Sequence, residues 1–126
     1  MPSVINIPST KLSNGMQIPL VGLGTYDALN EQELIDAVRA AIDVGYRYFD
    51  CAYLYNNEKV IGKAIRDAIE QSNGSLKRED FFILSKLWNT FHAKDQVPIG
   101  CQKSLDLFGF DYIDLYLIHW PVGFKV

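Results

Sequence analysis

Short apolar runs alternate with amphipathic stretches along most of the chain. The apolar runs predict four β-strands: PLVGLGT (19–25), YRYFDCA (46–52), DFFILSKLW (80–88) and DYIDLYLIHW (111–120). The third run is apolar at nearly every position, which is typical of a strand that is buried on both faces of a parallel sheet.

Between these runs, apolar residues recur at helical spacing, so each gap is predicted to hold one helix. The first helix follows Asn30, an N-cap candidate with Glu33 three residues later, and ends at Gly45, where a C′ glycine belongs. The second helix begins near Asn57, and the third ends at Gly109. The apolar stripes that predict the three helices are Leu34, Ala37, Val38, Ala41 and Ile42; Ile61, Ala64, Ile65 and Ala68; and Val97, Cys101, Ser104, Leu105 and Phe108.

A hairpin is predicted before the first of these strands. INI (5–7) and MQI (16–18) flank a segment that runs from Pro8 to Asn14 and Gly15. An Asn-Gly pair supplies the positive φ angles that a type I′ turn requires, so we expect this turn type at the pair.

The order βαβαβαβ predicts a parallel sheet with right-handed crossovers, and two architectures use this order. A doubly wound nucleotide-binding fold needs Gly-x-Gly-x-x-Gly at the first strand–helix turn. Gly22 and Gly24 fit this motif, but Asp27 occupies the position of the third glycine. The sequence therefore favours the (β/α)₈ barrel, in which polar groups gather at the carboxyl ends of the strands.

Composition narrows the classes of function. The 126 residues are 48% hydrophobic and 21% charged, which is ordinary for one globular domain. A net charge of -3 with scattered Lys and Arg argues against a nucleic-acid or polybasic membrane surface, and no apolar run approaches the roughly 20 residues that span a bilayer. The amino terminus lacks the pattern of a signal peptide, and Cys51 and Cys101 form no metal-ligand spacing or disulfide framework. We expect a reduced, cytoplasmic protein.

Four side chains with acid–base chemistry fall at the predicted strand ends. Asp50 lies near the end of the second strand, Tyr55 in the loop that follows, Lys86 in the third strand and His119 in the fourth. All strands of a parallel barrel point the same way, so these side chains are predicted to share one rim. Asp50 stands among apolar residues and needs a cation there, and Lys86 is its predicted partner.

These four residue types suit proton donation to a carbonyl oxygen. An ordinary phenol has a pKa of about 10, and an opposite charge within ~4–6 Å can lower a pKa by roughly 1–3 units. Tyr55 is therefore predicted to be the general acid, Lys86 to tune it, and Asp50 to hold Lys86. A neutral His119 would donate to the carbonyl oxygen and orient it.

Each of these residues taken alone also has a structural interpretation, and it is their coincidence on one rim that favours a function. No His/Cys/Asp cluster has zinc spacing. A hydrolase triad would depend on His92 or His119 without a Gly-x-Ser-x-Gly turn. Four aromatic residues are predicted to line a pocket at the rim or, alternatively, to be ordinary core and surface: Tyr26, Trp88, Trp120 and Phe124.

The sequence resembles the aldo-keto reductases, in particular the branch of aldose reductases, aldehyde reductases and hydroxysteroid dehydrogenases. The resemblance extends from about residue 10 to the last residue. It rests on the motifs VGLGT (21–25), AIDVGYRYFDCAYLYNNEKVIG (41–62), ILSKLW (83–88) and DYIDLYLIHWP (111–121). The family's catalytic tetrad of Asp, Tyr, Lys and His falls on Asp50, Tyr55, Lys86 and His119, the residues that strand-end placement selects.

The resemblance further implies that NADPH lies across the barrel mouth and that an aldehyde or ketone is reduced to an alcohol. The matching cofactor-binding positions are Gly24, Thr25, Tyr26, Asp50 and Lys86. The matching substrate-binding positions are Tyr26, Tyr55, Trp88, His119 and Trp120. Aldose reductases usually carry Trp at the position of Tyr26, whereas the hydroxysteroid branch carries Tyr, so the choice of substrate stays open.

A complete barrel takes about 250 residues. Residues 1–126 are therefore expected to be the amino-terminal half of an oxidoreductase domain, incomplete at the carboxyl end. Two open sheet edges favour self-association of such a half-barrel, whereas a full-length member is expected to be a monomer. Two hypotheses follow: an NADPH-dependent reductase of small carbonyl compounds, or a non-catalytic half-barrel that serves as a binding or regulatory partner.

Overall fold

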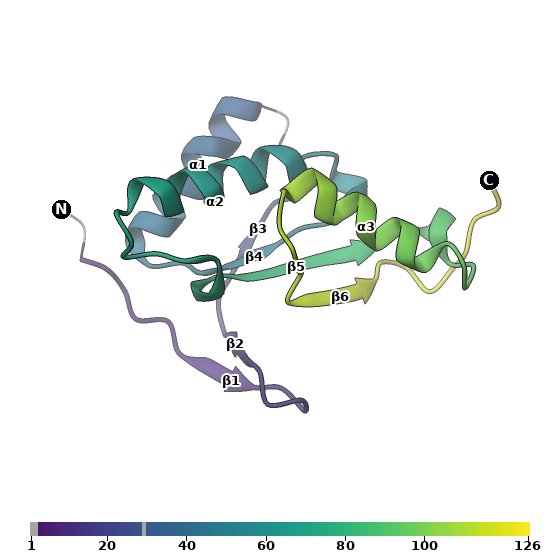
Figure 1. Cartoon of the computed structure of the whole chain (residues 1–126), viewed down its shortest axis with the longest axis horizontal. Coiled ribbons are helices and arrows are strands. Elements are labelled where there is room, and N and C mark those ends of the chain that lie inside the picture. Colours follow the sequence, from purple (N-terminus) through teal and green to yellow (C-terminus); the bar gives the residue numbers. More distant parts are fainter. Residues whose placement is uncertain (1–2, 29) are drawn as a thin grey trace.

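The computed structural model describes residues 3–28 and 30–126, and its main part is a four-stranded parallel sheet with three α-helices along one face (Figure 1). The strands are hydrogen-bonded in the order β3-β4-β5-β6, which confirms the predicted half-barrel with consecutive parallel strands. The strands are β3 (Leu23–Gly24), β4 (Tyr48–Asp50), β5 (Phe82–Leu87) and β6 (Leu115–Ile118), and the helices are α1 (Glu31–Val44), α2 (Glu58–Gln71) and α3 (Val97–Phe108). Among the described residues, no helix is both long and apolar enough to cross a membrane.

The strands are shorter than the apolar runs that predicted them. The predicted strand 19–25 is reduced to β3, which pairs with β4 through Leu23–Phe49 and Gly24–Asp50. The predicted strand 111–120 is reduced to the four residues of β6. The central strand β4 is also shorter than its predicted run, 46–52, so the shortening is not confined to the outer strands. Apolar character therefore located the strands correctly but overestimated their lengths.

The α-helices begin and end close to the predicted caps. The side chain of Asn30 accepts a hydrogen bond from the backbone nitrogen of Glu33 at 3.1 Å. At the other end of α1, Gly45 has a φ of 111°, a left-handed conformation that strains any residue with a Cβ. Gly109 closes α3 in the same region of φ. Local cap chemistry was therefore a sound guide to the helix boundaries.

The hydrophobic core lies between the helices and the sheet. Val38, Ile65 and Phe108, one from each helix, are fully buried together with Phe49 and Ile83 from the two central strands. Complete burial of one such side chain contributes roughly 1.5–3 kcal/mol.

Strand alternation sends the neighbouring side chains to the opposite face of the sheet. Ser85 points toward the helices, where it bonds to α2, whereas the next residue, Lys86, meets Asp50 on the other face. The core packing of β4 and β5 thereby fixes the direction of both charged side chains.

The predicted amino-terminal hairpin is present as β1 (Ser9–Lys11) paired antiparallel with β2 (Gln17–Pro19). Its first strand, however, was expected at residues 5–7, and the expected type I′ turn is wrong. Gly15 has a φ of 90°, but Asn14 is not among the described residues with positive φ.

The reason for the wrong turn type is the length of the hairpin loop. Leu12 accepts a hydrogen bond from the backbone of Gly15 at 2.9 Å, and the Asn14 side chain accepts one from the backbone of Met16 at 3.0 Å. A longer loop can use an ordinary turn with one left-handed glycine, whereas only a two-residue loop needs positive φ at both positions.

The hairpin lies at the amino ends of the parallel strands, away from the helices (Figure 1). A shallow cavity is lined by Ser9 and Gln17 of the hairpin and by Phe82 and Asp114 at the starts of β5 and β6. The hairpin thus lies across the bottom of the barrel and leaves the carboxyl ends of the strands free.

Candidate active site

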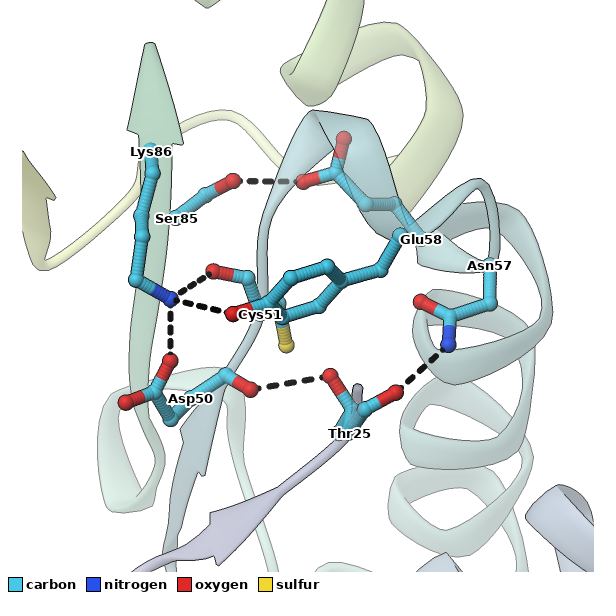
Figure 2. A network of polar contacts seen from close by, with 8 residues as sticks. Thr25, Asp50, Cys51, Asn57, Glu58, Ser85 and Lys86 are labelled. Carbon is cyan, nitrogen blue, oxygen red and sulfur yellow. Dashed lines mark hydrogen bonds and ion pairs between the residues drawn. The ribbon is translucent and has the colours of Figure 1, made fainter. Parts of the chain in front are cut away.

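Lys86, near the end of β5, meets Asp50, the last residue of β4. Its Nζ forms an ion pair with the Asp50 carboxylate and donates to the backbone oxygen of Cys51 at 2.8 Å (Figure 2). The Lys86 side chain is mostly buried, and that of Asp50 is 41% exposed. The cation that the apolar surroundings of Asp50 demand is therefore Lys86, as the sequence predicts.

Tyr55 belongs to a single 3₁₀ turn, η1 (Tyr53–Tyr55), between β4 and α2. Its hydroxyl oxygen lies 3.3 Å from Nζ of Lys86, which donates to it. Asn56 closes the turn with a φ of 56°, a left-handed conformation that Asn tolerates better than most residues. The turn thereby returns Tyr55 to the end of β5.

His119 follows β6 by one residue, and its backbone nitrogen donates to the oxygen of Leu87 at 3.1 Å. Its imidazole ring meets the ring of Tyr55 edge to face, with 5.7 Å between the ring centres. Within the described part of the chain, its Nδ1 atom is buried without a hydrogen-bond partner. The structure thus brings all four predicted acid–base residues together at one rim.

The surroundings of Lys86 keep it charged. Burial lowers the pKa of Lys86, but the hydrogen bond and the charge of Asp50 outweigh this effect, so the pKa is raised above its ordinary value. Lys86 is therefore an ammonium group at neutral pH. An ammonium group next to a phenol stabilises the phenolate that is left when the phenol gives up its proton.

The surroundings of His119 lower its pKa, whereas those of Lys86 raise the pKa of the lysine. Burial and the positive charge of Lys86 lower the pKa of His119, and Asp50 only partly compensates. The imidazole is therefore neutral at pH 7 and has one N–H to donate.

Aromatic side chains surround the acid–base residues. The ring of Tyr26, which is 72% exposed, packs edge to face on Tyr55 at 5.1 Å. Trp88 lies 5.6 Å from His119, 5.2 Å from Trp120 and 5.7 Å from Phe124, measured between ring centres. The aromatic residues predicted as a pocket wall therefore do gather at the rim, while their contact with a substrate stays a prediction.

Two predicted cofactor residues at the end of β3 differ in their surroundings. Gly24 is exposed, and a Cβ at this position would meet nothing within 4 Å. Thr25 is buried: its hydroxyl donates to the backbone oxygen of Asp50, and its carbonyl accepts from Asn57, both at 2.8 Å. Thr25 thus joins β3 to β4 and to the start of α2, and its contact with a cofactor stays a prediction.

Sequence reasoning missed a buried carboxyl group beside the site. Glu58, the first residue of α2, accepts hydrogen bonds from Ser85 at 2.6 Å and from Ser104 at 2.8 Å. Burial raises the pKa of Glu58, and the two serine hydroxyls only partly oppose this. A signal was available, because Ser85 is a polar residue inside an apolar run, directly before Lys86, and buried polar groups need partners.

The chain as a whole resembles known proteins. The model of the aldo/keto reductase family matches residues 20–124. The chain belongs to this family. It is 47% identical over 120 residues to aldose reductase C of Dictyostelium discoideum, a match that covers 95% of this chain and 37% of that protein. It is 51% identical over 114 residues to the NAD(P)H-dependent D-xylose reductase of Pachysolen tannophilus, covering 90% and 34%.

Solved aldo/keto reductases share the fold. The aldose reductase from Schistosoma japonicum superposes with a TM-score of 0.88 at 46% identity, covering 94% of this chain and 38% of that one. The aldo-keto reductase of Bombyx mori in complex with NADP gives a TM-score of 0.89 at 42% identity, covering 97% and 41%. The sequence thus spans between 34% and 41% of the length of these aldo/keto reductases.

Proposed function

We propose that this chain supplies the acid–base site of a carbonyl reductase that converts an aldehyde or ketone to the alcohol with NADPH. The observation that carries the proposal is the position of the Lys86 ammonium group, which contacts both the Asp50 carboxylate and the Tyr55 hydroxyl. The names of the aldose and xylose reductases among its relatives support a carbonyl substrate. The Bombyx mori protein in complex with NADP supports the cofactor.

In the proposed reaction, bound NADPH supplies a hydride to the carbonyl carbon. Tyr55 gives its phenolic proton to the carbonyl oxygen, which becomes the hydroxyl of the alcohol, and Tyr55 is left as the phenolate. Lys86, 3.3 Å away, stabilises that negative charge, and Asp50 holds Lys86 in place. His119 donates its N–H to the carbonyl oxygen and orients it. A positioned general acid typically contributes 10²–10⁴-fold in rate, on the order of several kcal/mol.

Three features of the rim support binding of the nicotinamide and ribose end of NADPH. Gly24 leaves open space at the end of β3, and the ring of Tyr26 is exposed for contact with a flat heterocycle. The exposed side of the Asp50 carboxylate is free to accept from a ribose hydroxyl while Lys86 holds the group from behind. We assign the cofactor to Gly24, Thr25, Tyr26, Asp50 and Lys86, and the substrate to Tyr26, Tyr55, Trp88, His119 and Trp120.

The test is a complete barrel in which residues 1–126 replace the matching part of the Schistosoma japonicum aldose reductase. We expect this chimera to oxidise NADPH with an aromatic aldehyde, measured as the loss of reduced-cofactor absorbance. Tyr55→Phe should lower turnover at least about 10²-fold. NADPH affinity should stay nearly unchanged, because the variant removes only the proton donor.

Tyr53→Phe is the matched control, since it removes a hydroxyl from the same 3₁₀ turn and should leave turnover intact. Full activity of the Tyr55→Phe chimera would show that Tyr55 is not the acid. A chimera that binds NADPH but reduces no aldehyde or ketone would instead favour the non-catalytic half-barrel.

A further inference from the structure

Glu58 is a buried carboxyl group that the proposed reaction does not use. It is 1% exposed, and its two oxygens accept from different elements: Oε2 from Ser85 on β5 at 2.6 Å, and Oε1 from Ser104 on α3 at 2.8 Å (Figure 2 shows the bond to Ser85). Both serines are fully buried. The first residue of α2 is thus fixed to β5 by a direct hydrogen bond.

The residue before Glu58 makes a second such attachment. Asn57 is buried, and its Nδ2 donates to the backbone oxygen of Thr25, directly after β3, at 2.8 Å (Figure 2). Two consecutive residues therefore reach in different directions, one to the end of β3 and one to β5. The start of α2 is located against the sheet at two points.

These attachments frame the turn that carries Tyr55. Tyr55 precedes Asn57 by two residues, and Ser85 directly precedes Lys86. Two hydrogen bonds and two short stretches of chain form a closed ring. Ser85 donates to Glu58, and Lys86 donates to the Tyr55 hydroxyl at 3.3 Å. The chain joins Ser85 to Lys86 and Tyr55 to Glu58. A shift of the start of α2 would change the distance from Lys86 to the Tyr55 hydroxyl directly.

We propose that Asn57 and Glu58 act as a clamp that positions the hydroxyl of Tyr55 against the ammonium group of Lys86. The proposal rests on the proposed function only in that Tyr55 is taken as the proton donor. In this role Glu58 and Asn57 are positioning residues, because both side chains are buried and act through Tyr55.

A carboxyl group is a costly way to fill this space, which supports a positioning role. Burial of a carboxyl group is unfavourable unless its partners compensate for lost hydration, whereas an apolar side chain of similar volume would pack without that cost. Hydrogen bonds are directional, and apolar packing tolerates small shifts. The network therefore fixes the first turn of α2 more tightly than a leucine would.

The two serines offer a matched pair of variants, because they occupy the two oxygens of the same group and are equally buried. Ser85→Ala removes the attachment beside Lys86, and Ser104→Ala removes the one to α3. The readout is the set of NMR cross-peaks from the Tyr55 ring to the Lys86 side chain and to the His119 ring, recorded on the 126-residue chain. The clamp predicts that Ser85→Ala abolishes these cross-peaks and that Ser104→Ala retains them.

Glu58→Gln should retain the cross-peaks, because an amide can still accept from Ser85. If Ser85→Ala does not fold, Glu58→Leu combined with Ser85→Ala and Ser104→Ala replaces the carboxyl group and both serine hydroxyls by apolar groups and tests the same contact. Cross-peaks that persist in Ser85→Ala, or in this triple variant, would overturn the clamp, and so would their equal loss in Ser85→Ala and Ser104→Ala.

Turnover of the chimeric barrel distinguishes a failure of the clamp from a failure of Tyr55 as the proton donor. With Tyr55 misplaced by about 1 Å, kcat in Ser85→Ala should fall about 10²-fold with KM nearly unchanged. Loss of the cross-peaks without loss of turnover would support the clamp and refute Tyr55 as the acid. Retained cross-peaks refute the clamp whatever the turnover.

Discussion

Asp50 and Glu58 are eight residues apart in the chain but have different surroundings. Asp50 is partly exposed and paired with the ammonium group of Lys86. Glu58 is buried and bonded to two serine hydroxyls, which donate hydrogen bonds but carry no charge. Hydroxyls compensate only in part for the lost hydration of an ionised carboxyl group, so burial raises the pKa of Glu58.

The raised pKa of Glu58 predicts how stability depends on pH. The unfolded carboxyl group ionises near its ordinary pKa of 4.5, whereas the folded group holds its proton to higher pH. Between the two values the folded state binds more protons, so the contribution of Glu58 is fully present below pH 4.5 and is lost as pH rises through the folded pKa. Relative to Glu58→Gln, the wild type should lose at most about 1.4 kcal/mol per pH unit in this window.

Urea unfolding of both proteins at a series of pH values above 4 measures that difference. Glu70→Gln, an exposed position on the same helix, is the control and should follow the wild type at every pH. A constant difference between the wild type and Glu58→Gln across the whole series would contradict the assignment.

Lys86→Met tests the proposed tuning of the proton donor. Methionine keeps an unbranched apolar stem but removes the ammonium group 3.3 Å from the Tyr55 hydroxyl. Without that charge the phenolate is not stabilised, and we expect the turnover of the chimeric barrel to fall about 10²–10⁴-fold. Lys63→Met removes a mostly exposed lysine of α2 and should leave the rate unchanged. Equal rates for the two variants would show that Lys86 has no such role.

At the scale of elements, α2 and α3 come into backbone contact at Gly62. A Cβ built at this position would lie 2.6 Å from the Cα of Phe108, the last residue of α3. The neighbouring atoms are backbone and cannot rotate away. Gly62 therefore sets the distance between the two helices.

The change in unfolding free energy caused by Gly62→Ala shows whether helix propensity or packing dominates at this position. Helix propensity alone favours alanine by about 1 kcal/mol, whereas overpacking typically costs about 1–3 kcal/mol. Because the contact is with backbone, we expect the packing cost to lie in the upper part of its range and to give a net loss of up to about 2 kcal/mol in the free energy of urea unfolding. Lys59→Ala, exposed on the same helix, should show no loss. A gain in stability for Gly62→Ala would mean that the helices separate without cost.

The helix ends that the sequence predicted correctly are formed by residues close together in the chain. The cap at Asn30 and the left-handed glycine at Gly45 involve residues within one helical turn, so the local pattern was sufficient. The turn at Asn14 was wrong, because the same Asn-Gly pair suits both a two-residue and a longer hairpin loop. Local signals therefore give the elements with modest errors at their ends.

In the candidate site, the sequence predicted the strand-end residues but not the contacts between helices. Strand-end placement was enough to bring Asp50, Lys86 and His119 together, because the direction of parallel strands follows from their order. Glu58 was missed because its partner Ser104 lies 46 positions away on another helix. Such a pairing depends on how α2 and α3 pack, and no local pattern encodes it.

At the scale of the whole molecule, the sheet has two outer strands, β3 and β6. Ile118 on β6 is 67% exposed, and Leu117 beside it is also exposed. The acid–base residues come from β4, β5 and the segments directly after β4 and β6, and they contact one another although the described part of the chain pairs only one side of β3 and of β6. Under the proposed function, this rim holds only the nicotinamide and ribose end of NADPH.

Because only this end of NADPH would be held, we predict that a polypeptide of these 126 residues alone reduces aldehydes with NADPH very weakly or not at all. Hydride transfer needs the nicotinamide about 3–3.5 Å from the carbonyl carbon, and such positioning can be worth roughly 7–11 kcal/mol. The measurement is NADPH oxidation with an aromatic aldehyde, with the chimeric barrel at equal concentration as the control. Robust turnover by a verified monomer would show that this part of a barrel holds the cofactor unaided.

The order of the strands also has a consequence for how the chain folds during its synthesis. Each strand of the sheet pairs with the strand that was made just before it, and each connection passes through one helix. Translation adds about 5–20 residues per second, and hairpins and helices form within microseconds. As β4, β5 and β6 leave the ribosome in turn, each finds its partner already present. The ion pair of Asp50 and Lys86 can therefore close as soon as β5 emerges, before β6 brings His119 to the rim.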